Sequence, residues 1–344
     1  MPNSGPPHAP TVPHTVRDLP VPDIGFHSTI SRGRVHRVAL AETFVTDIVP
    51  LAADLFACGA QLPRSHAYFG EGGHPPAHHD TLLLVEVVRQ AVMAGAHEFH
   101  GIPEEDKFVL THNRIAVTSL PALRVGPAPG NLTVNVRVVR TVLRDDVVRG
   151  LDFEAILLAD GHPVAEAGMG MVYKTPASYQ RLRDRGRAEV GLAPEGRPLG
   201  PLPPVAPDLV GRRDPANVVL SASRATGPAG VGAGLRVDQD HPSMFDHPQD
   251  HIPGMVMNEA FRQIALHAAD AAHALHPGRG RLTRLDAVFA RFGELDLPAT
   301  ATAVAGAPVT SGGLLTVPVT ATLAQRDAPI STAEIELAYL RQGS

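Results

Sequence analysis

The sequence contains little cysteine and little lysine. Cys58 is the only cysteine of the 344 residues, which excludes an intramolecular disulfide and indicates a reducing compartment. It lies among small residues, as packing cysteines do, so we do not expect a thiol nucleophile. Lysine occurs only at Lys107 and Lys174, so arginine supplies nearly all of the positive charge.

The sequence also lacks a long apolar run. No segment approaches the roughly 18 apolar residues of a membrane-spanning helix, and the Pro- and His-rich first 30 residues lack the apolar core of a secretory signal. A net charge of -5 argues against a basic surface for nucleic acid. No histidine pair has metal-helix spacing beside carboxylates. We therefore expect a soluble cytoplasmic protein without a metal, another cofactor, a nucleic-acid partner or a membrane partner; a homo-oligomer stays possible.

The length predicts more than one folded unit. A chain of 344 residues exceeds the limit of about 250–300 for a single core. Proline and glycine concentrate near 192–208, where they would stiffen a connection. The domain prediction is therefore a flexible tail over 1–30, a first domain over 31–190, a linker over 191–208 and a second domain over 209–344.

One motif, Glu-x-x-Arg-Gln, occurs twice inside an almost unbroken apolar run. The copies lie within 82–91 and 254–265. A helix that is apolar nearly all round is a core helix, where glutamate and arginine are rare unless paired. Burying such ions costs several kcal/mol each. The alternative, purely structural interpretation is an ordinary surface ion pair between positions i and i+3 of a helix. The apolar flanks and the repetition favour groups kept for chemistry.

Each predicted helix, near 80–98 and 253–275, lies among segments of alternating polarity. Such alternation is typical of strands with one buried face, and Asp160-Gly161 predicts a hairpin between two of them. One long helix wrapped in an antiparallel sheet is the hotdog arrangement, so the fold prediction is α+β, a tandem double hotdog forming a pseudo-dimer. The predicted strands are 38–40, 43–46, 108–110, 113–117, 132–139, 151–158, 164–167, 217–220, 285–290, 299–304, 314–322 and 333–338.

The second motif copy is similar to a known signature. Residues 251–263 resemble the Pro-Gly-x4-Glu-Ala-x2-Gln pattern of hotdog 3-hydroxyacyl-[acyl-carrier-protein] dehydratases. Taken over 35–344, the chain resembles more closely the A-factor biosynthesis hotdog proteins (AfsA type). That resemblance rests on three motifs in the right order, at 61–69, 82–91 and 245–255.

The resemblance implies an acyltransferase. Members of this family transfer a 3-oxoacyl chain from an acyl carrier protein to dihydroxyacetone phosphate, which commits it to a γ-butyrolactone-type, butenolide or furan signal. Two alternatives stay open: a hotdog acyl-thioester hydrolase or dehydratase, and a non-catalytic regulator that binds acyl chains or lactones.

Site residues follow from the helix motifs. Desolvation would raise the pKa of Glu86 and Glu259 and make them bases for the acceptor hydroxyl. On that view, Glu259→Gln lowers turnover about a hundredfold or more while the fold survives. The resemblance implies that the N–H of Gly254, at a helix start, polarises the thioester carbonyl.

The remaining candidates would bind substrate. Arg89 and Arg262 suit a phosphate, or else neutralise the neighbouring Glu. Gln90 and Gln263 would orient the Glu or cap local polar groups rather than react. His66 and His247 precede the helices and would complete the site across the pseudo-dimer, or make structural hydrogen bonds.

The two copies differ ahead of the helix. The first has Asp80-Thr81 where the second has Pro253-Gly254, and the Asp80 charge would oppose a developing oxyanion. Neither copy has a histidine at the usual dehydratase position, which falls on Phe245. These differences predict a single principal acyl site at the second helix and argue against simple dehydration.

Overall fold

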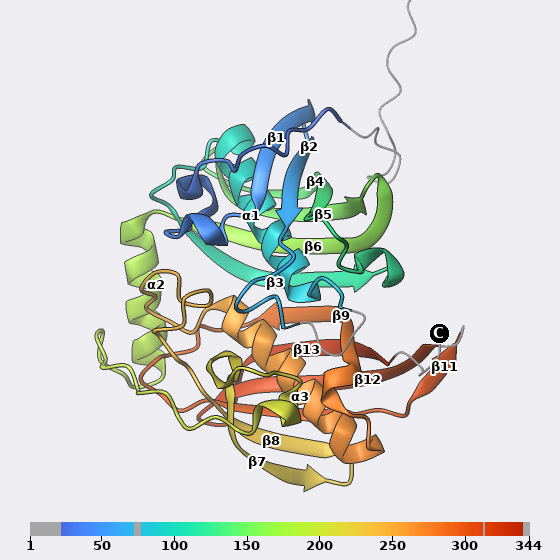
Figure 1. The fold of residues 1–344 in the computed structure, drawn as a ribbon. Coiled ribbons are helices and arrows are strands. Elements are labelled where there is room, and N and C mark those ends of the chain that lie inside the picture. The colour runs from blue at the N-terminus through green and yellow to red at the C-terminus, as the bar shows by residue number, and fades with distance from the viewer. Residues whose placement is uncertain (1–21, 72–76, 312–313, 340–344) are drawn as a thin grey trace, which may run out of the picture.

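The computed structural model describes residues 22–71, 77–311 and 314–339, which exclude most of the predicted tail. In this described part, thirteen antiparallel strands form one continuous sheet, and two 20-residue helices pack against it (Figure 1). The helices are α1 (Thr81–His100) and α3 (Gly254–His273). The predicted combination of antiparallel sheet and long core helices is therefore confirmed.

The two halves of the chain have the same connectivity. In each half two strands precede the helix. The strand that follows the helix takes the last place in an order of six strands, at the edge where the half meets its neighbour. The orders are β1-β2-β4-β5-β6-β3 and β7-β8-β10-β12-β13-β9, with β11 paired to β12. The strands are β1 (Val45–Ala52), β2 (Leu55–Leu62), β3 (Lys107–Val117), β4 (Gly130–Arg144), β5 (Val147–Ala159), β6 (His162–Lys174), β7 (Leu220–Gly227), β8 (Gly230–Leu235), β9 (Gly280–Phe289), β10 (Thr300–Ala305), β11 (Val309–Ser311), β12 (Leu314–Gln325) and β13 (Ala328–Tyr339).

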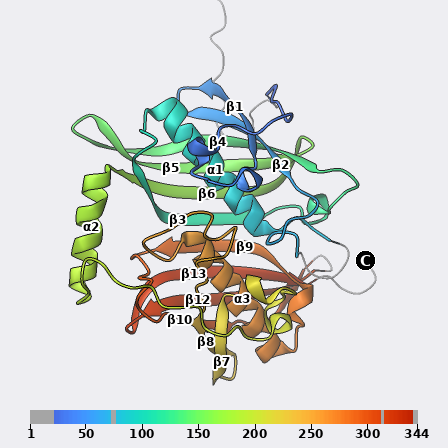
Figure 2. The ribbon, with the colours of Figure 1, turned by 60° about the vertical axis from the view of Figure 1, so that its left-hand side comes forward.

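The halves join where β3 pairs with β9, through residues 112–116 and 284–288. The sheet therefore continues from one half into the other, and α1 and α3 lie on the same side of it in contact with each other (Figures 1 and 2). Residues from both halves consequently reach the space between the two helices.

Local sequence explains most of these elements. α1 is buried from Thr81 to Ala96 except at Arg89, as its apolar run predicts, and it ends where Gly101 adopts a left-handed conformation. The predicted hairpin at Asp160-Gly161 joins β5 to β6, with positive φ at both residues as a tight turn requires. None of the described helices combines the length and the apolarity needed to cross a membrane.

A third helix, α2 (Pro176–Glu189), was not predicted. It is polar almost all round, so its sequence carries little periodic signal. Charged contacts fix it instead: Arg183 donates to both oxygens of Glu294 at 2.7 and 2.8 Å, and Arg187 donates to Asp296 at 2.6 Å. α2 thereby stands beside the junction of the two halves (Figure 2).

Two short strand predictions are wrong. Residues 38–40 lead into a 3-10 turn, Leu40–Glu42, because the Asp246 carboxylate accepts hydrogen bonds from the N–H groups of Val38 and Ala39 and replaces a strand partner. Residues 215–217 form another 3-10 turn, so β7 begins only at Leu220. Strands β2, β8 and β11 were not predicted, and β8 is rich in glycine, which has low β propensity.

Candidate active site

The first repeated motif surrounds Glu86 with donors. Its side chain is 0 % exposed. Arg89 donates to both carboxylate oxygens at 2.8 and 2.7 Å, and Gln90 donates at 2.7 Å. Arg37, from the segment before β1, adds a hydrogen bond at 3.1 Å and an ion pair at 2.7 Å. The carboxylate is therefore fully engaged by its own protein.

The second motif repeats the arrangement around Glu259, also 0 % exposed. Arg262 and Gln263 donate to it from the same helix, and Arg212 contacts its two oxygens at 3.0 and 2.9 Å. Tyr68 of the first half donates its hydroxyl at 2.8 Å. The Glu259 carboxylate thus joins the two halves.

The glutamines fix the strands next to each helix. Gln90 donates to the carbonyl of Glu42 and accepts from the N–H of Phe44; Gln263 does the same with Asn217 and Val219. Both amides therefore orient a glutamate, as predicted, and also satisfy backbone groups before a strand.

The expectation of raised glutamate pKa values is wrong. Burial alone would raise the pKa of each carboxyl, but the two nearby arginines and the hydrogen bonds outweigh it and lower the pKa of Glu86 and of Glu259 to about 2. Each carboxylate has a second arginine outside its helix motif, Arg37 for Glu86 and Arg212 for Glu259, and this added charge reverses the effect of burial. A carboxylate with so low a pKa is a weak base near neutrality.

His66 corresponds in structure to His241, not to His247. The Nδ1 of His66 accepts from the N–H groups of two following residues, and Nδ1 of His241 does the same. The Nε2 of each ring contacts a buried residue ahead of a strand, Glu42 and Asn217 respectively. Both rings hold loops in place, so the structural alternative applies to His66.

The two helix starts differ as the sequence suggested. Asp80 caps α1, accepting from the N–H of Leu82 at 2.9 Å. α3 begins after Pro253, and no side chain caps it. A Cβ atom on Gly254 would come within 3.0 Å of Leu110, so glycine allows this close approach. The N–H groups of the first turn of α3 are thus available to a ligand oxygen.

A polar cavity of about 520 Å³ lies between the halves at this helix start. Arg89 faces it, and its Nη1 meets only the thioether sulfur of Met93 among its described contacts, a weak acceptor that a stronger one could replace. The carboxylates at its edge, Asp246 and Asp250, already accept hydrogen bonds from protein groups. Its basic and imidazole lining is Arg37, Arg89, Lys107, His36, His247 and His251.

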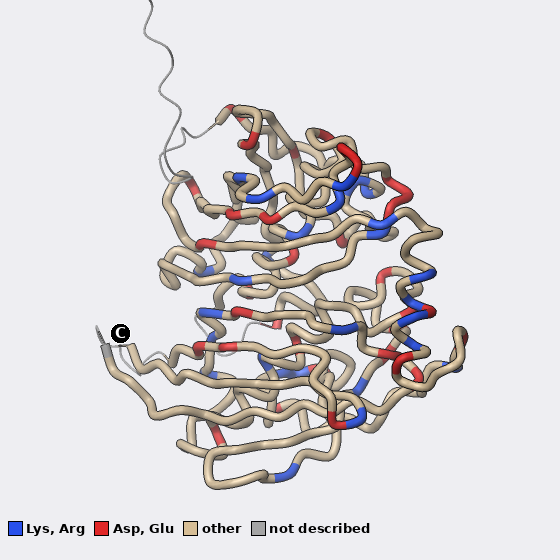
Figure 3. The backbone as a smooth tube through the Cα atoms, turned by 180° about the vertical axis from the view of Figure 1, so that it is seen from behind, with Lys and Arg blue, Asp and Glu red and all other residues tan. Residues whose placement is uncertain are grey.

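The electrostatics of this cavity favour an anion. The pKa of His36 falls to about 3, first because the ring is buried and then because His97, Arg89, His247 and Lys107 place like charges nearby. Burial disfavours a charge of either sign, so it is the positive charge of Arg89 and Lys107 on the lining that favours an anion here. Elsewhere on the backbone, basic and acidic positions are interspersed over both halves (Figure 3).

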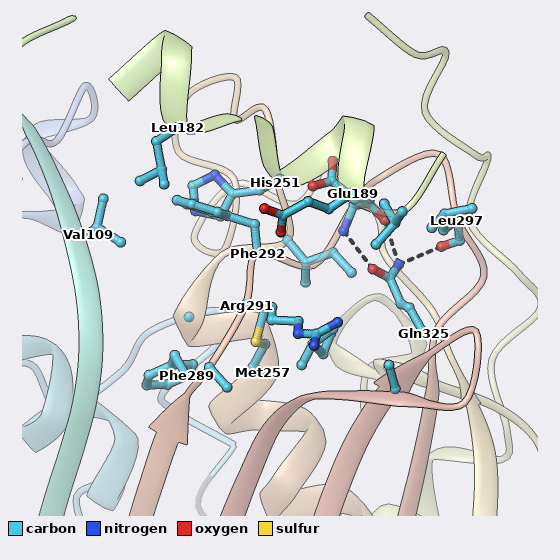
Figure 4. Close-up of a pocket in the computed structure, with 18 of the residues that line it drawn as sticks. Val109, Leu182, Glu189, His251, Met257, Phe289, Arg291, Phe292, Leu297 and Gln325 are labelled. Carbon is cyan, nitrogen blue, oxygen red and sulfur yellow. Dashed lines mark hydrogen bonds between the residues drawn. The ribbon is translucent and has the colours of Figure 1, made fainter. Parts of the chain in front are cut away.

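An apolar cavity of about 700 Å³ adjoins the polar one. α2, the end of β9 and the loop after it form its walls, and Figure 4 shows Leu182, Met257, Phe289, Phe292 and Leu297 around it. The two cavities share three lining residues: Leu110, His251 and Gly254. Their junction is therefore the start of α3.

His251 stands at that junction with a fixed orientation. Its Nδ1 lies 2.7 Å from Asp250, which also accepts from the Tyr179 hydroxyl at 2.8 Å and from Arg183 at 3.1 Å. Burial alone would raise the pKa of Asp250, but the hydrogen bonds and charges of His251, Tyr179 and Arg183 lower it well below its usual range. An ionised carboxylate at Nδ1 leaves Nε2 to exchange a proton with a ligand.

The corresponding place at α1 is nearly closed. Its cavity measures about 40 Å³, and the Asp80 carboxylate fills the position facing Arg262, at 2.8 Å from Nη1. Arg262 is thus paired with Asp80 and Glu259. The predicted phosphate ligands therefore differ: Arg89 faces an open cavity, and Arg262 faces an internal anion.

Several residues of this site escaped the sequence reasoning. Arg37 and Arg212 lie outside the recognised motifs. Tyr68, His251 and Asn258 lie within them but were given no role, although His251 precedes the Pro-Gly pair by only two residues. Cys58 is buried, and burial raises the pKa of its thiol well above the usual range, which argues against a nucleophile. The described residues contain no group of three His, Cys, Asp or Glu placed to hold a metal ion.

A family model for the A-factor biosynthesis hotdog domain matches residues 20–173 and 196–340. A 2-oxo-3-(phosphooxy)propyl 3-oxoalkanoate synthase of Streptomyces virginiae is 36 % identical over 274 residues, covering 79 % of this chain and 85 % of the relative. Proteins of the same name from Streptomyces griseus and Streptomyces coelicolor are 35 % and 32 % identical, over 69 % and 83 % of this chain and 75 % and 85 % of theirs.

Proposed function

The chain belongs to the A-factor biosynthesis hotdog family, and from this membership we propose that it transfers a 3-oxoacyl chain from an acyl carrier protein thioester to the hydroxyl of dihydroxyacetone phosphate. The product is a 2-oxo-3-(phosphooxy)propyl 3-oxoalkanoate, the ester after which the relatives are named, and it is a precursor of γ-butyrolactone-type signals. One observation carries the proposal: an apolar cavity and a basic polar cavity meet at the uncapped start of α3.

The two cavities suit the two substrates. The acyl chain enters the apolar cavity beside Met257 and Phe289, where its methylene groups leave water. The phosphate of the acceptor enters the polar cavity, where Arg89 and Lys107 supply charge. The thioester carbon then lies at the junction, beside Gly254 and His251.

The transfer needs one base and one oxyanion donor. The hydroxyl oxygen of dihydroxyacetone phosphate attacks the thioester carbon, and its proton passes to Nε2 of His251. The N–H of Gly254 stabilises the oxyanion. The carbon–sulfur bond then breaks, and the imidazolium returns the proton to the carrier thiolate. Atoms and charges balance without a further reactant.

The same proposal covers the organisation of the chain. Its halves are two hotdog units in a tandem pseudo-dimer, divided by the proline-rich segment 191–208. Only the α3 unit is catalytic, because Asp80 occupies the equivalent anion position at α1. Glu86 and Glu259 position their arginines, Glu259 also joins the halves through Tyr68, and neither acts as the base.

A direct assay tests the proposal. Incubation of the purified protein with a 3-oxoacyl carrier-protein thioester and dihydroxyacetone phosphate should release free carrier and form the phosphorylated ester, detected by mass spectrometry. Carrier release at the same rate without the acceptor would identify a hydrolase instead. Tight binding of the donor without any turnover would identify a binding protein.

The phosphate position predicts a specific effect of Lys107→Gln. This change should raise the KM for dihydroxyacetone phosphate about tenfold and leave the KM for the acyl donor unchanged, because one phosphate charge contact is lost. Lys174, the strand partner of Lys107 across β3 and β6, lines neither cavity. Lys174→Gln is therefore the matched control, and equal effects of the two variants would contradict the assignment.

A further inference from the structure

Two buried asparagines meet beneath the polar cavity. Asn113 of β3 and Asn258 of α3 are each 0 % exposed, and Nδ2 of Asn258 donates to Oδ1 of Asn113 at 3.1 Å. Among the described residues, Nδ2 of Asn113 and Oδ1 of Asn258 have no hydrogen-bond partner. If both amides were turned round, the pair would still leave one donor and one acceptor unmatched.

A buried amide group without a hydrogen-bond partner is destabilising, because it has lost its water and gained nothing in return. Most buried polar groups in proteins have partners, so an exception needs an explanation. Both asparagines are among the residues that line the polar cavity, so their unpaired groups lie buried beside the space that a ligand would fill. The pair therefore has the properties of a preformed binding subsite.

The position of Asn258 indicates which ligand group reaches it. It follows Gly254 by four residues, so the two lie on the same face of α3, about 6 Å apart along the axis. Helix side chains lean toward the N-terminus, which brings the Asn258 amide closer to the helix start. A carbonyl bound at the N–H of Gly254 would therefore hold its neighbouring atoms above the asparagine pair.

We propose that the Asn113–Asn258 pair is a subsite for the 3-oxo group of the acyl donor. The inference rests on the proposed acyl transfer, in which Gly254 binds the thioester carbonyl. The ketone, two carbons beyond the thioester carbonyl, lies on the polar side of the junction and accepts the free N–H of the pair, and the acyl chain turns into the apolar cavity only beyond it. The free amide oxygen faces the methylene between the two carbonyls, whose polarised hydrogens make weak C–H···O contacts.

This subsite would select 3-oxoacyl over saturated donors. A saturated chain places a methylene against the free N–H and leaves it unpaired after water is expelled. Sites built to hydrogen-bond a substrate group reject an analogue lacking that group strongly, because their own polar groups then stay unpaired. Chain length, by contrast, is left to the apolar cavity.

Asn113→Leu tests the subsite by removing the amide at similar volume. With wild-type protein, kcat/KM for a 3-oxoacyl carrier thioester should exceed that for the saturated donor of equal length. In the variant, kcat/KM for the 3-oxo donor should fall 10–100-fold while that for the saturated donor changes less than twofold. Thermal unfolding confirms that the variant folds, and Asn258→Ala gives a second, smaller truncation of the pair.

Asn135 supplies the matched control. It is a buried asparagine of β4 with an unpartnered Oδ1, and it lines none of the three cavities described above. Asn135→Leu should leave donor selectivity unchanged. An equal fall for both donors in Asn113→Leu, or unchanged selectivity in both Asn113→Leu and Asn258→Ala, would overturn the subsite.

A binding measurement separates this inference from the proposed function. Inert 3-oxoacyl and saturated acyl pantetheine amides, measured by calorimetry, should show a wild-type preference for the 3-oxo analogue that Asn113→Leu abolishes. If wild-type protein formed no ester but kept this preference, the transfer proposal would fail and the subsite would stand. If the protein formed the ester but showed no preference for the 3-oxo donor in binding or turnover, the transfer proposal would stand and the subsite would be overturned.

Discussion

Glu259→Ala is expected to lower the free energy of unfolding by about 3–5 kcal/mol, because it leaves Arg212 and Arg262 buried without their shared partner. It also removes the acceptor of the Tyr68 hydroxyl and so weakens a contact between the halves. Chemical denaturation followed by circular dichroism measures the loss. Activity should fall with the folded fraction of the protein.

The same carboxylates predict how stability depends on pH. The pKa of Glu86 and of Glu259 is about 2 in the folded protein, below their ordinary value of 4.5. A lowered pKa contributes stability above the unfolded value that is lost as pH falls through the folded value. Wild-type stability should therefore decline from pH 4.5 toward 2, and Glu259→Ala should lose part of that decline.

A surface pair provides the control for Glu259. Glu154 pairs with Arg114 at 2.6 Å, but both side chains are about half exposed. Glu154→Ala should cost less than about 1 kcal/mol. A Glu259→Ala protein as stable as wild type but without activity would contradict the structural role and restore this residue as the catalytic base.

His251→Ala is expected to reduce kcat by about 10²–10⁴-fold, since general-base catalysis commonly contributes factors of that size. The fold should persist, because this ring is partly exposed at the cavity junction. Steady-state transfer kinetics measure the loss. Added imidazole should restore part of the rate, because a free base can occupy the vacated position.

His273 provides a control that distinguishes the loss of a catalytic base from the general effect of removing a histidine. His273, at the far end of α3, contacts only the carbonyl of Gly306 at 2.8 Å among its described hydrogen bonds. His273→Ala should retain normal kcat. A His251→Ala protein with normal kcat, or one that imidazole fails to rescue, would remove His251 from the proton-transfer step and leave the base to be sought elsewhere in the polar cavity.

Part of the site was visible in the sequence because its signal is local. Glu86, Arg89 and Gln90 lie within one helical turn, so their spacing alone predicted that they meet on a single helix face. Gly254 was predictable in the same way, from a Pro-Gly pair ahead of an apolar run. Their chemistry was harder to predict, because the pKa of a buried carboxyl depends on every charge around it.

The other side chains that pair with Glu86 and Glu259 come from distant segments of the chain. Arg37 is 49 residues from Glu86, Arg212 is 47 from Glu259, and Tyr68 is 191 away. No periodicity links such positions. Arg37 meets Glu86, and Arg212 meets Glu259, because the segment before the strands of each half folds back onto the helix of that half. Only the contact of Tyr68 with Glu259 needs the two halves to join.

The sequence by itself determined the two core helices, most strands and the difference between the helix starts, since apolar periodicity, turn residues and capping act over a few neighbouring positions. Tertiary structure alone decided which cavity is open and which carboxylates are neutralised. It also decided where His251 and the asparagine pair stand relative to Gly254. Those properties depend on charges and volumes that distant segments contribute, and the polar cavity exists only once the two halves have joined.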